Sequence, residues 1–242
     1  MKQVKLKQII TDEVEPAILG LVHLQQLLDV AWAYEGGRHA AYVVLATWAA
    51  LRPTETRVLD VSKIDLDEGW VKMSGKFAKT RSRRMVELMP NILLMLRDLR
   101  DRGLLNSEAL NPTGRCWTSI RALAGLAGSR ESIAEWCFVP QKDRWRSEHR
   151  AIELVAPCQR SELVDYVKDV LRHTGISHHL AWFNNEHLAA GWAGNSPAII
   201  HKHYKGLVST LEAQAFWTML PTALKQAGKQ VSPPEGGRVR RV

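Results

Sequence analysis

The sequence predicts a mainly α-helical α+β protein that contains one small antiparallel β-sheet. Apolar residues recur at helical spacing in most segments of the chain, and proline, glycine or asparagine separates these segments. Only the region 70–88 shows the alternation of apolar and polar residues that is typical of strands. With 242 residues, 45% of them hydrophobic, the chain is long enough for one substantial domain.

The first helices are predicted in the first quarter of the chain. Residues 1–15 are polar and charged, which is typical of a leader or the stub of a linker. Helical spacing predicts a helix over 16–34, and a second helix over about 38–51 is almost entirely apolar and belongs in the core. The short helix predicted for 53–61 begins with a proline, which a first turn tolerates. Arg52 then lies at a junction between helices, where its side chain can point into a cleft.

The predicted sheet is a hairpin. Residues 70–73 and 84–88 alternate as strands do, and the loop between them is rich in lysine and arginine. A proline opens the next predicted helix, over 90–102, and a glycine follows it. Residues 104–160 show no clean periodicity, apart from a helical pattern at 116–126.

Helical patterns return in the last third of the chain. Helices are predicted over 161–183 and 186–192. Ser196 followed by proline is a strong helix start, and this helix carries Tyr204 near its end. An amphipathic helix is predicted over 211–220.

The charge of the chain favours a polyanionic partner. Lysine and arginine number 33 against 25 acidic residues, a net charge of +8. This balance favours nucleic acid first and an anionic membrane surface second, and a basic enzyme without such a partner stays open. Residues 223–242 carry five basic residues against one acidic residue, together with prolines and glycines, and are predicted to be a disordered tail.

We expect no cofactor, metal site or membrane partner. The three cysteines are widely spaced without a CxxC pair, and the nine histidines lack a matching carboxylate or thiolate constellation. No secretory signal follows the basic start, and the longest apolar stretch, 40–51, is too short to span a bilayer. These features indicate a reduced, cytoplasmic compartment.

Four motifs occur in order along the chain: Leu51-Arg-Pro-Thr-Glu55, the basic hairpin Lys79-Thr-Arg-Ser-Arg-Arg-Met-Val-Glu-Leu88, Leu171-Arg-His-Thr174, and Gly194-Asn-Ser-Pro197 followed by Tyr204. In this order and context the sequence resembles the tyrosine recombinases, or phage-integrase family, from about Leu24 to Pro221. The resemblance implies a catalytic domain of that family over 16–222, with its mainly helical fold and small sheet.

The resemblance also implies catalytic roles. Tyr204 is the expected nucleophile, which attacks a DNA phosphodiester and forms a 3′-phosphotyrosine link. Arg52 and Arg172 are the expected phosphate clamp, because fork-shaped guanidinium groups match phosphate oxygens. Lys79 is the expected general acid for the leaving 5′ oxygen, and Lys76 remains an alternative for that role. The residues expected to contact DNA are Lys76, Arg81, Arg83, Arg84, Lys168 and His173.

Two positions depart from the family pattern. Asp169 stands three residues before Arg172, where the family usually has histidine or lysine, and Asn195 stands where it has histidine or tryptophan. Both remain in the expected catalytic set, because a carboxylate can accept a proton and an amide can donate a hydrogen bond to phosphate. The loss of general acid–base help predicts chemistry slower by about 10²-fold.

Three functions follow as hypotheses. The first is site-specific recombination of double-stranded DNA for the integration or excision of a mobile element, by a homotetramer assembled on DNA in the nucleoid. The second is a DNA-binding protein that keeps the integrase fold and has impaired cleavage. The third is a helical scaffold whose basic tail binds acidic proteins. The family usually has a helical core-binding domain before the catalytic domain, so we expect either a fragment or a chain that relies on a partner.

Overall fold

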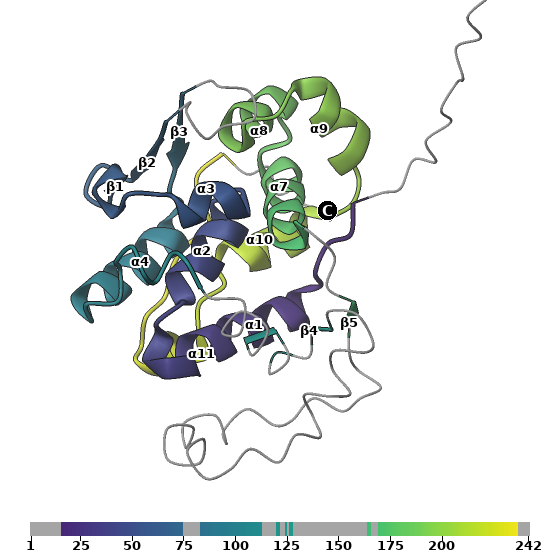
Figure 1. Ribbon diagram of the computed structural model, residues 1–242. Helices are drawn as coiled ribbons and strands as arrows, with labels where there is room; N and C mark the ends of the chain where they lie inside the picture. Colours follow the sequence, from purple (N-terminus) through teal and green to yellow (C-terminus); the bar gives the residue numbers. More distant parts are fainter. Residues whose placement is uncertain are drawn as a thin grey trace, which may run out of the picture.

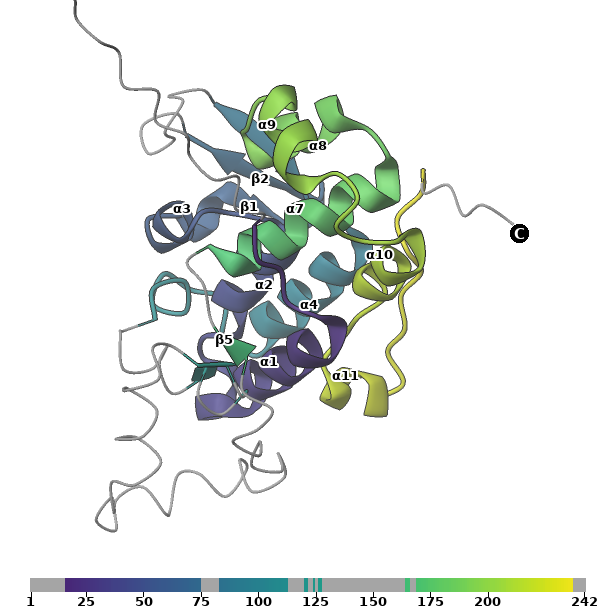
Figure 2. The ribbon, with the colours of Figure 1, turned by 90° about the vertical axis from the view of Figure 1, so that its right-hand side faces the viewer.

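The computed structural model describes residues 16–74, 83–112, 120–121, 124, 126–127, 164–165 and 169–236. The described part is mainly helical and contains a three-stranded antiparallel sheet, so the predicted fold class is confirmed. Helices α8 (Glu186–Ala193) and α9 (Pro197–Tyr204) lie at one end of the molecule with the sheet, and α1 (Leu21–Ala33) and α11 (Thr222–Gln226) lie at the other (Figures 1 and 2).

The core is built around α2 (Ala40–Trp48), in which every residue is buried. This helix packs against α7 (Val170–Phe183), α4 (Pro90–Asp101) and α1. The helix contains no charged residue, so its complete burial does not remove any charge from water. The apolar core helix predicted for 38–51 is therefore confirmed, with shorter limits.

Helices α2 and α7 approach each other very closely at Gly175. A Cβ atom added to this glycine would lie 2.0 Å from the backbone carbonyl oxygen of Thr47, a distance that no real Cβ contact allows. Because Gly175 has no side chain, α7 can pack this close to the centre of the core. This approach also fixes Arg172, three residues earlier on α7.

A short connection after α2 leads to α3 (Pro53–Arg57). Ala50 in this connection has a φ of 46°, a left-handed conformation that is uncommon for a residue with a side chain. Two short 3₁₀ turns, η1 (Tyr34–Gly37) and η2 (Val61–Lys63), flank this part of the chain. Pro53 occupies the first turn of α3, as the sequence predicts.

The sheet has the order β1-β2-β3, with β1 at Ile64–Asp65, β2 at Trp70–Met73 and β3 at Arg84–Glu87. Val71 pairs with Val86 in the antiparallel register of β2 and β3, and both are fully buried. One face of the sheet therefore packs on the core. Helix α8 is tied to this sheet, because the indole nitrogen of Trp192 donates to the Glu87 carbonyl over 3.1 Å.

The helices of the last third begin at clear caps. The side chains of Asn185, Ser196 and Ser209 accept backbone N–H groups at the starts of α8, α9 and α10 (Thr210–Trp217). Helix α10 packs against α7, and Phe216 on α10 stacks on His178 with ring centroids 4.2 Å apart. From the apolar stripe predicted for 211–220, Phe216, Met219 and Leu220 are buried within the chain, whereas Leu211 is 72% exposed.

Two expectations for local structure need correction. The helix predicted over 161–183 begins only at Val170, after Asp169 in a left-handed conformation with a φ of 62°. Residues Val164–Asp165 form β5, which pairs in parallel with β4 at Leu126–Ala127, so a strand lies where a helix was predicted. The pairing is long-range, and the local apolar pattern does not reveal it.

Residues 223–236 of the predicted disordered tail have a defined conformation, and 237–242 lie outside the described part of the chain. Asp29 on α1 accepts the backbone N–H of Thr222 at 2.7 Å and its hydroxyl at 2.8 Å, which caps α11. Further on, the indole nitrogen of Trp182 donates to the Pro234 carbonyl over 3.0 Å. These two anchors come from distant parts of the chain, and their contacts outweigh the polar composition of the segment. In the described part of the chain, no helix is both long and apolar enough to cross a membrane.

Candidate functional site

Three arginines gather around one buried carboxylate at the junction of α3, β3 and α7. We call Arg52, Arg84 and Arg172 the arginine cluster. Arg52 lies at the N-terminal cap of α3, Arg84 begins β3 and Arg172 lies in the first turn of α7. The carboxylate belongs to Glu55, whose side chain is 1% exposed.

Glu55 holds two of the three arginines. Arg84 donates to both carboxylate oxygens, over 2.9 and 2.8 Å, and Arg52 donates from its guanidinium over 3.0 Å and from its backbone N–H over 2.9 Å. Burial alone would raise the pKa of Glu55, but hydrogen bonds from Arg84 and Arg52 and the charges of both outweigh it and lower the pKa to about 2. Glu55 is therefore ionised at any physiological pH.

Arg172 is held by backbone oxygens instead of a carboxylate. Arg172 is 5% exposed, and its guanidinium donates to the carbonyls of Ala50 and Ala193, the latter over 2.6 Å. Burial, together with the nearby charge of Arg52, lowers the pKa of Arg172 to about 10. The left-handed backbone at Ala50 thus supplies an oxygen to a buried cation.

The turn between α8 and α9 closes the cluster. Arg52 donates to the Gly194 carbonyl over 2.9 Å and to Asn195 Oδ1 over 3.2 Å, and Arg172 donates to the same Oδ1 over 3.3 Å. Gly194 has a φ of 68°, and a Cβ there would lie 2.9 Å from an Arg84 nitrogen. Arg84 therefore packs directly against the turn that presents Asn195.

The cluster carries more positive than negative charge. Three guanidinium groups against the single carboxylate of Glu55 leave a formal charge of +2 among these four residues, and the further partners of Arg52 and Arg172 are neutral oxygens. Arg172 faces only dipoles and Arg52 shares the Glu55 carboxylate with Arg84, so an anion is the favoured next partner of both. Chemically, the arrangement suits the binding of a phosphate oxygen between Arg52 and Arg172.

Tyr204 lies at the end of α9, next to this cluster. This residue is 5% exposed, and its hydroxyl forms a 2.8 Å hydrogen bond with Nδ1 of His173, the neighbour of Arg172 in sequence. Burial raises the pKa of Tyr204, with a further rise from Asp169 and opposing effects from Arg172 and Arg52. Burial lowers the pKa of His173, aided by Arg172 and His203 and opposed by Asp169.

The structure brings together most of the predicted catalytic residues that it describes. Arg52, Arg172 and Asn195 share hydrogen bonds, and the charges of both arginines act on the pKa of Tyr204. Asp169 immediately precedes α7, makes no capping hydrogen bond with its side chain and acts on Tyr204 and His173 through its charge. The predicted residues Lys76, Lys79, Arg81 and Lys168 lie outside the described part of the chain.

The two described arginines of the hairpin have different environments. Arg83 is exposed, as a DNA-contacting residue would be. The side chain of Arg84 is only 8% exposed and is bound to Glu55. A signal for this burial was present in the sequence, because strand period two places Arg84 on the same face as the core residues Val86 and Leu88. The sequence pattern does not reveal that Arg84 pairs with Glu55.

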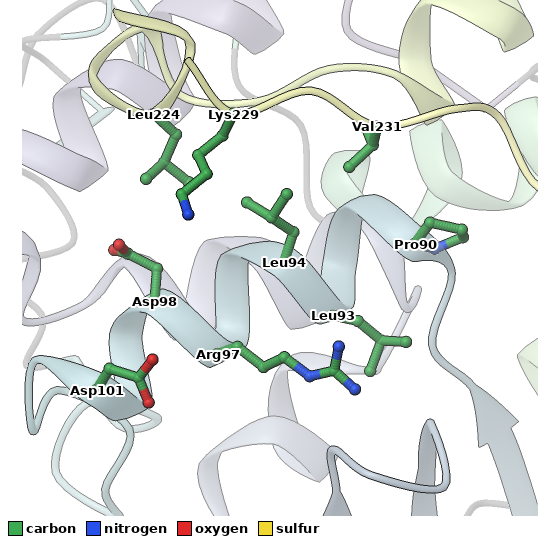
Figure 3. A pocket seen from close by; sticks show the side chains of 9 residues that line it. All are labelled: Pro90, Leu93, Leu94, Arg97, Asp98, Asp101, Leu224, Lys229 and Val231. Atoms are coloured by element: carbon green, nitrogen blue, oxygen red, sulfur yellow. The ribbon is translucent and has the colours of Figure 1, made fainter. Parts of the chain in front are cut away.

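Two of the hollows in the described part of the molecule differ in their relation to the candidate site. One, of about 500 Å³, is lined by Tyr204 and residues that follow it, together with residues from the end of α7 and the start of α8. The other, of about 440 Å³, lies between α4 and the segment 224–231 and contains no residue of the arginine cluster (Figure 3). Among the described residues, no group of three or more histidine, cysteine or acidic side chains is placed to hold a metal ion.

The described fold and site define a mainly helical α+β protein with a buried arginine cluster beside a buried tyrosine. No protein-family model matches the chain, and no curated protein matches it significantly. Among solved structures, the chain is similar to the crystal structure of XerA recombinase, at 18% sequence identity and a TM-score of 0.47. The similarity covers 84% of this chain and 65% of the recombinase chain, so this chain spans about two thirds of that protein's length.

Proposed function

We propose that this protein breaks and rejoins double-stranded DNA through a tyrosine nucleophile. The observation that carries the proposal is the shared acceptor of Arg52 and Arg172, both of which donate to Asn195 Oδ1 in a cluster that also acts on Tyr204. Two guanidinium groups that converge on one oxygen are suited to the charge that develops on a phosphodiester under attack. The motif order that resembles the tyrosine recombinases supports the same assignment.

In the proposed reaction, the Tyr204 oxygen forms a bond to phosphorus while the bond from phosphorus to the 5′ oxygen breaks. The phenolic proton passes to Nδ1 of His173, which is within hydrogen-bond distance. The 5′ oxygen leaves as a hydroxyl with a proton from Lys79, the role that the family resemblance assigns. Rejoining is the reverse reaction, in which the 5′ hydroxyl displaces Tyr204 and no cofactor is consumed. Site-specific integration or excision of a mobile element by a tetramer on DNA belongs to this proposal.

The test is a covalent trap. Duplexes selected for binding from a random library would be nicked near the bound site, so that cleavage releases a short strand and prevents rejoining. The wild type should give a protein–DNA adduct that resists denaturation, Tyr204→Phe should give none, and the matched control Tyr34→Phe should keep the adduct. Absence of an adduct with the wild type on its selected site would refute the cleavage function.

A second function rests on a specific observation. Tyr204 is buried, and the positions of Asp169 and Asn195 depart from the family pattern. We therefore also propose, as the alternative, a DNA-binding protein with impaired cleavage. It predicts salt-dependent binding to duplex DNA that Tyr204→Phe leaves unchanged, with no adduct in the covalent trap. Sedimentation with and without paired DNA sites tests assembly into a tetramer in either case.

A further inference from the structure

Asn195 places its side-chain oxygen at the point where two guanidinium groups converge. Oδ1 lies 3.2 Å from a terminal nitrogen of Arg52 and 3.3 Å from one of Arg172. The backbone holds this position, because the Asn195 N–H donates to the Ala190 carbonyl over 3.0 Å and Gly194 turns the chain in a left-handed conformation. The side chain is therefore presented to both arginines by a fixed turn.

The chemistry of the groups determines which end of the amide faces the arginines. A guanidinium group has donors only, and a carboxamide has an accepting oxygen and a donating nitrogen. With the nitrogen turned inward, donors would face donors at both contacts, so the oxygen must point to Arg52 and Arg172. Asn195 thus offers these cations the same kind of atom that a phosphate would offer, with a dipole in place of a full charge.

We propose that Asn195 is an internal placeholder for phosphate. In the free protein its Oδ1 occupies the acceptor position that Arg52 and Arg172 share, and a non-bridging oxygen of the DNA backbone displaces it. The displaced amide then turns and donates a hydrogen bond from its nitrogen to the same phosphate. The identity of the displacing group as a phosphodiester rests on the proposed function, whereas the placeholder itself rests on the geometry of the cluster.

A placeholder of this kind has two effects on the free protein. The Asn195 oxygen accepts hydrogen bonds from both Arg52 and Arg172. It therefore holds these two positive groups near each other, although the cluster has only one carboxylate. It also makes every anion displace an existing contact, so the two arginines bind an anion less tightly than they would without Asn195. A fully charged phosphate displaces the Asn195 amide easily, whereas a weakly binding competitor does not.

The variants Asn195→Asp and Asn195→Ala separate this role from others. Asp places a permanent carboxylate between the two guanidinium groups, so it should raise the thermal stability of the free protein and weaken the binding of inorganic phosphate by about tenfold or more. Ala removes both the competing acceptor and the later donor, so phosphate affinity should stay within about threefold of the wild type. Opposite changes in stability and in binding exclude general damage to the fold.

The matched control is Asn184→Asp, the same chemical change at an exposed residue on another turn. It should leave phosphate binding, measured by titration calorimetry, unchanged. The placeholder is refuted if Asn195→Asp binds phosphate as the wild type does, if Asn195→Ala loses as much affinity as Asn195→Asp, or if the wild type binds no phosphate. The covalent trap with wild-type protein reports separately on the proposed cleavage, so either idea can fail alone.

Discussion

The hydroxyl of Tyr204 lies 2.8 Å from Nδ1 of His173, and burial shifts the pKa of the two side chains in opposite directions. The higher pKa of Tyr204 keeps the phenol protonated, and the lower pKa of His173 keeps the imidazole neutral near pH 7. A neutral Nδ1 beside a phenol can accept its proton. In the proposed reaction, His173 is therefore the base that accepts the proton of Tyr204.

The first prediction concerns the pH dependence of adduct formation. The rate should fall as the pH drops through the pKa of His173, which lies below 6.5, because a protonated imidazole cannot accept the phenolic proton. His173→Gln should slow adduct formation by about 10²-fold and remove this acidic limb. His187→Gln, a change at an exposed histidine, should keep both the rate and the limb. Single-turnover kinetics over pH 5 to 8 checks this, and a limb retained in His173→Gln contradicts it.

The second prediction separates Arg84 from its neighbour Arg83. Arg83 is exposed, so Arg83→Gln should weaken DNA binding and reduce the salt slope by about one. Arg84→Met should leave the slope unchanged and lower the free energy of unfolding by about 3–5 kcal/mol, because it strands the buried carboxylate of Glu55.

The double variant Arg84→Met with Glu55→Gln supplies the control for this prediction. It removes the stranded charge, so chemical denaturation should show that most of the lost stability returns. If Arg84→Met alone reduced the salt slope as Arg83→Gln does, Arg84 would be a DNA contact and its structural role would be refuted.

The third prediction concerns the close approach of α2 and α7. Gly175→Ala should lower the free energy of unfolding by about 3 kcal/mol or more, because the added Cβ meets backbone atoms of Thr47 that cannot move aside. Gly191→Ala is the matched control on α8, where the added Cβ meets nothing within 4 Å, and it should stabilise the protein by about 0.5–1 kcal/mol. Equal effects of the two changes in thermal unfolding would contradict the structure.

The fourth prediction is acid destabilisation by two buried histidines. Burial lowers the pKa of His178 to about 4 and that of His179 to about 3. Because the unfolded chain binds more protons below pH 6.5, this contribution to stability is complete above that pH and is lost as the pH falls toward 4 and 3. Each histidine adds a slope of about 1.4 kcal/mol per pH unit in this window.

His179 offers a direct test of the acid effect. Its ring stacks on Trp192 at 4.3 Å, and its Nδ1 has no hydrogen-bond partner among the described residues, so a phenylalanine can replace it. His179→Phe should flatten the pH dependence of the free energy of unfolding between pH 6.5 and 4, and the exposed control His187→Gln should not. An unchanged slope in His179→Phe would show that His179 is not neutral in the folded protein.

Much of the fold follows from local pattern. Three features can be predicted from the sequence because each depends on nearby residues: the apolar run that forms α2, the proline that begins α3 and the Ser-Pro start of α9. A common site for Arg52, Arg172 and Tyr204 was likewise predicted, from the order of their motifs along the chain. The pairing of β4 with β5 could not be predicted from the sequence, because each strand has two residues and its partner is far away in sequence.

The internal contacts of the site also depend on distant residues. Arg84 was predicted to face DNA from the charge of its hairpin, but its position on the strand turns it inward to Glu55. Asn195 was expected to donate to phosphate, and only the arrangement of Arg52 and Arg172 around it shows that its oxygen faces them. Charge and motif identify which residues gather, whereas the direction of each side chain follows from packing.

The anchoring of the segment 222–236 limits how this protein can be engineered. Asp29 and Trp182 hold its two ends, and Leu224 and Val231 face α4 along the way (Figure 3). A fusion partner joined at Pro221 would remove these contacts and leave apolar side chains of α4 open to solvent and to aggregation. Chimeras should therefore keep the native chain through Gly236 and attach their cargo beyond it.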